Sequence, residues 1–228
     1  MSTIADNIAL VSSRIRAAAL AAHRDEHSVQ LLAVSKTKPA EALREAHAAG
    51  QRDFGENYLQ EALGKQLELA DLPLIWHFIG PIQSNKTRAI AEHFAWVHSV
   101  DRLKIAQRLS EQRPADLPPL NICIQVNVSG EASKSGCTPT DLPALAKAIS
   151  ELPRIKLRGL MAIPEPTENR AAQDAAFAAV QSLQASLDLP LDTLSMGMSH
   201  DLESAIAQGA TWVRIGTALF GARDYSQP

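Results

Sequence analysis

Short apolar runs alternate along this chain with longer stretches in which apolar residues recur at helical spacing. The first run, residues 31–35, predicts a strand, and residues 40–49, closed by Gly50, predict the helix that follows it. Seven further runs predict strands at residues 52–57, 74–80, 94–100, 120–128, 155–163, 193–198 and 211–215. The stretches between them predict helices at residues 59–70, 85–93, 101–112, 140–152, 170–187 and 201–208.

This alternation within 228 residues predicts a (β/α)8 TIM barrel that occupies residues 1–228 as a single domain. Residues 3–22 place Ile4, Ile8, Val11 and Ile15 on one helical face, which predicts an extra N-terminal helix ahead of the barrel. A doubly wound open sheet also produces alternating strands and helices, so it stays open as an alternative.

Composition narrows the class of ligand. Basic and acidic residues, 22 and 25 in number, are spread along the chain and give a net charge of −3, so no basic stripe predicts nucleic-acid binding. The sequence shows neither a secretory leader nor a membrane-spanning run, and Cys123 lies within an apolar run as an inert thiol. We expect a cytoplasmic protein, not bound to membranes, that takes a small and anionic ligand.

Lys36 stands at the end of the first apolar run, shortly before Pro39. A hydrophobic setting lowers the pKa of a lysine and frees its nucleophilic form, so an apolar strand that delivers one amine to a sheet edge suits an imine-forming lysine. The alternative is a solvated lysine at a strand end, which is the commoner role of this residue type.

Residues that could bind a ligand or take part in a reaction gather at the predicted carboxyl ends of the strands, where barrels build their active sites. Polar loops are common in any protein, so this gathering is a moderate signal by itself. The residues are Lys36, Glu56, Asn57, His77, Gly80, Ser99, Asn127, Met161, Ser199, Arg214, Gly216 and Thr217.

The last two strands predict a phosphate site. Ser199 is placed to cap the helix that follows strand seven, and Gly216 and Thr217 leave strand eight through a glycine that permits close approach. Asp201 and Glu203 follow in the same helix; they would repel a phosphate that they faced, so we expect them to point away from it.

Arg214 lies among apolar neighbours that argue for burial, and a buried guanidinium needs a partner. A structural ion pair and a ligand contact are both open. His77, between Trp76 and Phe78, suits either a hydrogen-bonded core histidine or a ligand contact. No zinc site is expected, because His23 and His27 lack further ligands at metal spacing.

Together these residues resemble the pyridoxal phosphate homeostasis protein family (the YggS/PROSC type), whose barrel is similar to the N-terminal domain of alanine racemase. The resemblance runs almost end to end. Its motifs stand here as Ala33-Val34-Ser35-Lys36, Phe54-Gly55-Glu56-Asn57-Tyr58, Trp76-His77-Phe78-Ile79-Gly80, Gln83-Ser84-Asn85-Lys86, Ser133-Lys134-Ser135-Gly136, Gly159-Leu160-Met161, Ser195-Met196-Gly197-Met198-Ser199 and Val213-Arg214-Ile215-Gly216-Thr217.

The resemblance implies that Lys36 forms an aldimine with pyridoxal 5′-phosphate (PLP), that Ser199, Gly216 and Thr217 hold the phosphate, and that Asn57 and His77 lie close to the cofactor. Arg214 matches the racemase position that meets the pyridine nitrogen. A permanently charged donor keeps that nitrogen unprotonated, which makes the ring a poor electron sink.

A racemase also needs a second acid–base group, which alanine racemases take from a tyrosine of a separate domain. This sequence ends at Pro228, soon after the barrel, and its only tyrosines are Tyr58, expected to pack at the start of a helix, and Tyr225. We therefore expect a carrier that holds PLP and delivers it to apo-enzymes, without efficient catalysis.

Two alternatives stay open: a PLP-dependent racemase or related enzyme, and an aldolase-like Schiff-base barrel that acts on a sugar phosphate.

Two smaller expectations complete the set. Lys134, in the glycine-flanked loop after strand five, is a candidate for a secondary or transfer site, against the alternative of a plain loop lysine. The chain is expected to be a monomer, because the dimerising domain of the racemases is absent from this sequence.

Overall fold

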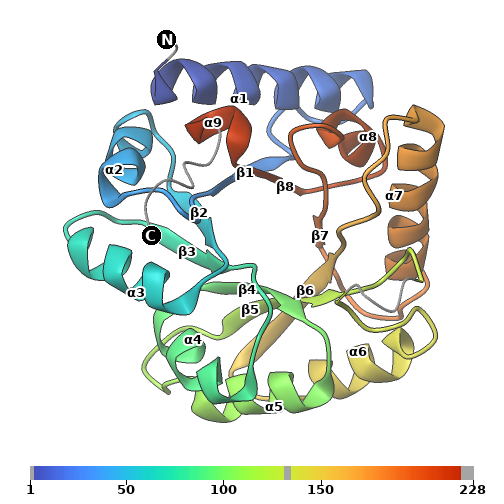
Figure 1. Ribbon diagram of the computed structural model, residues 1–228. Coiled ribbons are helices and arrows are strands. Elements are labelled where there is room, and N and C mark those ends of the chain that lie inside the picture. The colour runs from blue at the N-terminus through green and yellow to red at the C-terminus, as the bar shows by residue number, and fades with distance from the viewer. Residues whose placement is uncertain (1–2, 131–134, 222–228) are drawn as a thin grey trace.

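The computed structural model describes residues 3–130 and 135–221 of the chain. Eight strands form a closed barrel in chain order, and helices surround it (Figure 1). The strands are β1 (Gln30–Val34), β2 (Asp53–Glu56), β3 (Ile75–Phe78), β4 (Trp96–Val100), β5 (Leu120–Gln125), β6 (Ile155–Met161), β7 (Thr193–Ser195) and β8 (Trp212–Ile215). The helices are α1 (Ile4–Ala21), α2 (Ala40–Ala48), α3 (Leu59–Glu68), α4 (Thr87–His93), α5 (Leu103–Gln112), α6 (Leu142–Ser150), α7 (Arg170–Ala185), α8 (Leu202–Ala207) and α9 (Thr217–Phe220).

Every strand pairs in parallel with its neighbours in sequence, and β8 pairs with β1 through the register Leu32↔Arg214 and Ala33↔Ile215. This closure confirms the predicted barrel and rules out the open sheet. It also brings the residues after β1 next to those after β8, although they are far apart in the sequence.

Helix α1 covers the outside of β1 and β8, where it contacts α2, α8 and α9 (Figure 1). Thr3 and Asp6 form a capping box at its start, and its buried face carries Ile8, Val11 and Ile15 as predicted. Arg14 donates to Glu203 of α8. The extra N-terminal helix is thus a structural part of the outer ring.

The inside of the barrel is polar and aromatic, whereas the main hydrophobic core consists of aliphatic and phenylalanine side chains. Inside, the rings of Trp96, His77 and Trp212 contact one another, and the Arg158 guanidinium lies 4.7 Å from the Trp96 ring centre. Parallel barrels fill this space with branched apolar side chains more often than with polar ones. The polar filling here implies specific hydrogen-bonded partners.

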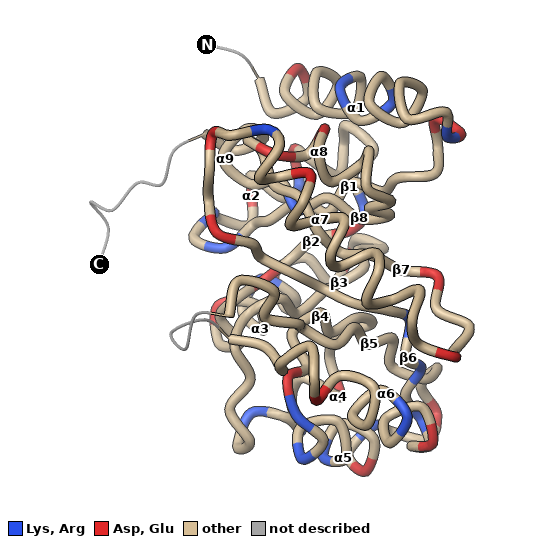
Figure 2. The backbone as a smooth tube through the Cα atoms, turned by 90° about the vertical axis from the view of Figure 1, so that its right-hand side faces the viewer, with Lys and Arg blue, Asp and Glu red and all other residues tan. Residues whose placement is uncertain are grey.

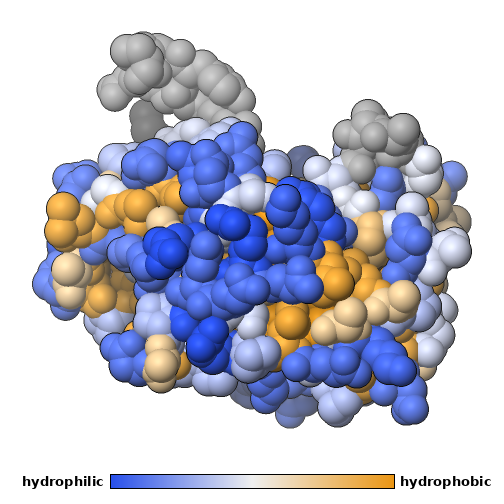
Figure 3. Space-filling model, turned by 90° about the horizontal axis from the view of Figure 1, so that it is seen from below, coloured by the Kyte–Doolittle hydropathy of each residue, from blue (hydrophilic) through white to orange (hydrophobic). Residues whose placement is uncertain are grey.

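Lysine and arginine positions are interspersed with aspartate and glutamate positions along the described backbone, as the sequence predicted (Figure 2). On the face formed by α4, α5 and α6, hydrophilic residues form a central band with hydrophobic areas on either side (Figure 3). Within the described residues, no helix combines the length and apolar character that a membrane crossing requires.

All eight predicted strands and all eight predicted helices exist, and the differences lie at their ends. A 3₁₀ turn, η1 (Ser84–Lys86), precedes α4, and the short helix α9 was not predicted. The prediction that Ser199 caps the helix after β7 is wrong: α8 begins at Leu202, and Asp201 occupies its N-cap position.

Candidate functional site

A cavity of about 220 Å³ opens at the carboxyl end of the barrel. Its walls come from the ends of β1, β2, β3, β6, β7 and β8 and from the loops that follow them. The lining residues are Val34, Lys36, Asn57, Ile79, Ile163, Met198, Ser199, His200, Arg214, Gly216 and Thr217. The structure therefore brings six of the seven predicted site residues around one cavity, and the exception is His77.

Lys36 enters the cavity from a tight turn that follows β1. Thr37, the next residue, has φ of +63°, a left-handed conformation that a β-branched residue seldom adopts. Its backbone N–H donates to Glu61 Oε1 at 2.6 Å, which holds the turn against α3. The lysine thus sits on a strained and externally fixed piece of backbone.

A buried polar cluster lies directly behind this turn, between the barrel and α3. Lys65 Nζ donates to Ser35 O and to Glu56 Oε1, both at 2.7 Å, and Ser35 Oγ donates to the same carboxylate oxygen at 2.6 Å. Burial raises the pKa of Glu56, although Lys65 and Ser35 oppose this shift. Glu56 was one of the strand-end candidates, but its side chain faces α3 and supports the lysine turn from outside.

Arg214 is buried and reaches the cavity from inside β8. Its Nη1 donates to Ser195 O at 2.5 Å and to Ser195 Oγ at 2.9 Å, and its Nη2 donates to Ala162 O at 2.9 Å. Burial lowers its pKa to about 10, so the group stays charged at neutral pH. Among the described residues no carboxylate lies within ion-pair distance of it, although the charge of Asp201 acts to raise its pKa, so the structure favours a ligand contact over the structural ion pair. Nε–H and the second hydrogen of Nη2 have no partner there and are left for a ligand.

The other wall of the cavity gathers Ser199, Gly216 and Thr217 next to Lys36. A Cβ on Gly216 would lie 3.2 Å from the Val34 carbonyl oxygen, so a larger residue would crowd the end of β1. Thr217 is the first residue of α9, and the backbone N–H groups at the start of a helix have no acceptor within the helix. Together with the two hydroxyl side chains, these groups form a polar pocket rich in donors.

The acidic residues near this wall turn away from it, as predicted. Glu203 Oε1 accepts from Arg14 of α1 at 2.8 Å, and Asp201 Oδ1 accepts from the Met198 backbone N–H at 2.6 Å. Neither carboxylate lines the cavity. Arg14 also donates to the Ser199 carbonyl oxygen at 3.3 Å, which ties the loop to the N-terminal helix.

Asn57 supplies an acceptor on the side of β2. Its Oδ1 is buried and has no hydrogen-bond partner in the described part of the chain, so it is available for a donor in the cavity. The Asn57 backbone lies so close to Gly80 that a Cβ on Gly80 would overlap with the Asn57 carbonyl oxygen. Ser99 Oγ donates to Gly80 O at 2.6 Å and holds this contact. Gly80 and Ser99, two further strand-end candidates, therefore have structural roles.

His77 does not line the cavity. It lies fully buried in the barrel interior, where its Nδ1 is 2.9 Å from His98 Nε2 and its Nε2 is 3.0 Å from Asp53 Oδ1. The position of His77 thus favours the hydrogen-bonded core histidine that the sequence left open over a direct ligand contact.

The sequence did not single out His200, Ile79 or Ile163 as site residues, although all three line the cavity. His200 directly follows Ser199, which was the available signal. Tyr58 stands at the start of α3 as predicted but is exposed and outside the cavity wall. Lys134 and Tyr225 lie outside the described residues. No cluster able to hold a metal ion occurs within residues 3–130 and 135–221.

Comparisons with known proteins agree with this geometry. The family model of the alanine racemase N-terminal domain matches residues 7–224. The pyridoxal phosphate homeostasis protein of Pseudomonas aeruginosa is 79% identical over 228 residues, which covers 100% of this chain and 99% of that protein.

Among solved structures, PipY of Synechococcus elongatus is 44% identical, and the match covers 96% of this chain and 100% of that one. The TM-score is 0.87 for the form without PLP and 0.86 for the form with PLP bound. This chain belongs to the pyridoxal phosphate homeostasis protein family, which has the barrel of the alanine racemase N-terminal domain.

Proposed function

We propose that this chain binds PLP in the cavity at the carboxyl end of the barrel, holds it covalently through Lys36, and passes it to enzymes that require it. Lys36 Nζ condenses with the cofactor aldehyde, forming a C=N bond and releasing one water. Ser199, Gly216 and Thr217 bind the phosphate, and Arg214 donates to the pyridine nitrogen. PLP bound to PipY, which shares 44% of its residues with this chain, supports the assignment.

The chain's own groups suit this cofactor at three points. The donor-rich wall at Ser199, Gly216 and Thr217 suits a phosphate, and the amine of Lys36 lies on the neighbouring loop because β8 pairs with β1. The buried Asn57 Oδ1 needs a donor, which a protonated imine or a phenolic hydroxyl provides. The observation that carries the proposal is this convergence on a single cavity of one lysine, one phosphate-type wall and one arginine that forms no ion pair within the described residues.

Arg214 supports storage, although racemases carry an arginine at the matching position, so the racemisation assay decides between the two roles. PLP serves enzymes as an electron sink, and it does so best when an acidic partner protonates the ring nitrogen. A guanidinium has no acceptor and does not give up its proton near neutral pH, so it leaves the nitrogen unprotonated. A cofactor held in this way does little to stabilise a carbanion, which suits storage.

Borohydride reduction tests the covalent attachment. We expect wild-type protein incubated with PLP to absorb visible light as an imine, to lose that band on reduction, and to retain the mass of one reduced cofactor on the peptide that contains Lys36. Lys36→Ala should form no adduct, while Lys104→Ala, on the exposed side of α5, should behave like wild type. A stoichiometric adduct in Lys36→Ala would overturn the assignment.

A racemisation assay separates the carrier from the enzyme. Purified protein with PLP and a panel of L-amino acids should produce no D-enantiomer above the rate of free PLP. Turnover that disappears in Lys36→Ala would contradict the proposed storage role.

A further inference from the structure

A single file of buried polar side chains crosses the barrel interior from the cavity to its opposite end. Arg214 Nη1 donates to Ser195 Oγ at 2.9 Å, and Ser195 Oγ is 2.8 Å from His98 Nδ1. His98 Nε2 is 2.9 Å from His77 Nδ1, and His77 Nε2 is 3.0 Å from Asp53 Oδ1. The three middle residues are fully buried, and five strands contribute one residue each.

When both histidines are neutral, the chemistry of the two ends fixes the direction of every hydrogen bond in this file. A guanidinium only donates and an ionised carboxylate only accepts. His77 Nε2 must donate to the Asp53 carboxylate, so the Nδ1 of a neutral His77 accepts from His98 Nε2. The Nδ1 of a neutral His98 then accepts the proton of Ser195 Oγ, which itself accepts from Arg214. With both histidines neutral, this arrangement, in which each ring is protonated on Nε2, satisfies all of these atoms.

The surroundings favour that neutral arrangement. Burial lowers the pKa of His77, which Asp53 opposes, and burial together with His77 and Arg214 lowers the pKa of His98 well below its usual range. The histidine rings are also held in place by packing, since His77 stacks on Trp96 with 5° between the ring planes. Neither ring can turn without losing these contacts.

We propose that Asp53, His77, His98 and Ser195 are positioning residues for Arg214. The file turns the lone pairs of the Ser195 hydroxyl toward Arg214 and its proton away, and thereby holds the guanidinium with its unused N–H groups available to the cavity. The aligned donors, with a carboxylate at the far end, also favour the positive charge. This inference rests on the proposed function, because the acceptor that Arg214 meets is the cofactor nitrogen.

Nitrogen NMR of histidine-labelled protein without cofactor tests the file on its own. We expect the imidazole shifts of His77 and His98 to show neutral rings protonated on Nε2 at pH 7.5. Asp53→Ala should change the tautomer population of His98, which Asp53 does not touch. A wild-type His98 protonated on Nδ1, or one unaffected by Asp53→Ala, would overturn the inference.

Cofactor binding tests the positioning role. His98→Phe keeps the ring bulk and breaks the file, and we expect the PLP dissociation constant to rise by up to about tenfold, since a net intramolecular hydrogen bond is worth roughly up to that factor. The absorption maximum of the bound cofactor should shift as well. Cys123→Ala is the matched control, because Cys123 is buried inside the same barrel and outside the file.

The outcomes are distinguishable. Wild-type protein that binds no PLP contradicts the proposed function, while the tautomer measurement still decides whether the file exists. Protein that binds PLP, with unchanged affinity and absorption in His98→Phe, contradicts the positioning role and leaves the proposed function standing. An equal loss of affinity in His98→Phe and Cys123→Ala would also overturn it, because the effect would then be general to the barrel interior.

Discussion

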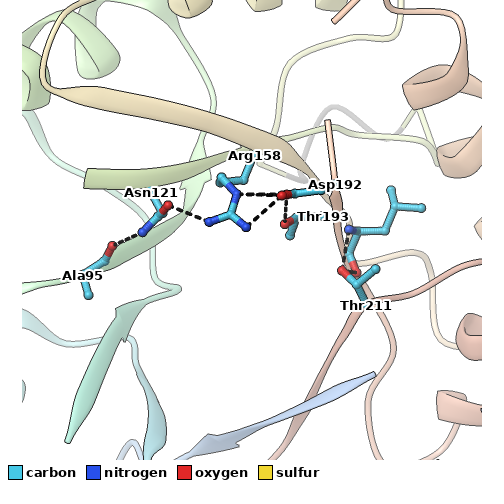
Figure 4. Close-up of polar contacts among 7 residues, drawn as sticks. Ala95, Asn121, Arg158, Asp192, Thr193 and Thr211 are labelled. Atoms are coloured by element: carbon cyan, nitrogen blue, oxygen red, sulfur yellow. Dashed lines mark hydrogen bonds and ion pairs between the residues drawn. The ribbon is translucent and has the colours of Figure 1, made fainter. Parts of the chain in front are cut away.

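The two ends of the barrel each hold an arginine inside the ring of strands, and they treat it differently. At the amino end, Arg158 donates from Nε and Nη2 to Asp192 and from Nη1 to Asn121, and Asn121 donates in turn to the Ala95 carbonyl oxygen (Figure 4). At the carboxyl end, Arg214 has a serine and two backbone carbonyl oxygens as partners. A guanidinium that pairs with a carboxylate has a structural role. A guanidinium that forms no ion pair can use its positive charge and its remaining N–H donors to bind a ligand.

The largest effect is expected at the cavity wall. Gly80→Ala places a Cβ against the Asn57 carbonyl oxygen, which is backbone and cannot move away cheaply, so we expect a loss of about 3 kcal/mol in the free energy of unfolding and weaker PLP binding. Gly64→Ala, within α3 and with open space around it, should gain about 0.5 to 1 kcal/mol. Urea unfolding checks both, and equal stabilities of the two variants would show that the contact between Gly80 and Asn57 is not tightly packed.

Exchanging each arginine for methionine tests the comparison itself. Arg158→Met removes charge-assisted hydrogen bonds and a ring contact, so it should cost about 2 kcal/mol of stability and leave PLP affinity unchanged. Arg214→Met should weaken PLP binding at least tenfold, with a smaller change in stability, because the cost of burying its charge is also removed. If the two variants lose stability and affinity in the same proportion, the proposed division of roles is wrong.

The histidines between the two ends predict an acid-side loss of stability. Their pKa values in the folded protein lie below 6.5, so below about pH 6.5 the unfolded chain binds protons that the folded chain does not. The free energy of unfolding should therefore fall as the pH is lowered from 7 to 5, by about 1 to 2 kcal/mol. Glu56, with its raised pKa, contributes in the opposite direction, since its stabilisation is lost as the pH rises.

Because Glu56 opposes the histidines, their contribution is measured by comparing the pH dependence of the free energy of unfolding between variants and wild type. The slope should flatten in His98→Phe and stay as in wild type in His27→Gln, whose side chain is 78% exposed. A wild-type slope in His98→Phe would mean that the barrel histidines are not the groups that titrate.

The smallest effect is expected at the strained turn beside Lys36. Thr37→Gly relieves the left-handed conformation of a β-branched residue, which should stabilise the protein by up to about 1 kcal/mol after the cost of added freedom in the unfolded chain. Arg154→Gly, at the amino end with φ of +58°, is the comparison, because its side chain donates to Ser110 O. We expect Arg154→Gly to gain nothing, since it loses that contact. Thermal unfolding of both variants decides whether strain is concentrated at the cavity end.

The sequence predicted the barrel because the spacing of apolar residues distinguishes each strand from each helix, and the folded protein keeps these elements in the same order. It also predicted that Lys36, Arg214 and the residues after β8 lie near one another at the carboxyl end of the barrel, because the ends of the strands can be recognised in the pattern. Which side of a strand a side chain occupies was harder to predict: Glu56 and Ser99 lie in the last residues of β2 and β4, yet neither lines the cavity.

The file from Asp53 to Arg214 had no local signal at all. His77 and His98 are 21 residues apart, and His98 and Ser195 are 97 apart, so these contacts exist only after the barrel has closed. His98 and Asp53 lie within segments that the sequence presented only as strands. Burial of Arg214 was predictable from its neighbours, but its carbonyl and serine partners were not.

A crystal structure of the protein with PLP tests the central claim most directly. The account predicts continuous electron density from Lys36 Nζ to the cofactor, with the phosphate against Ser199, Gly216 and Thr217 and the pyridine nitrogen within hydrogen-bond distance of Arg214. Covalent density at another lysine, or a ring nitrogen that does not meet Arg214, would contradict it.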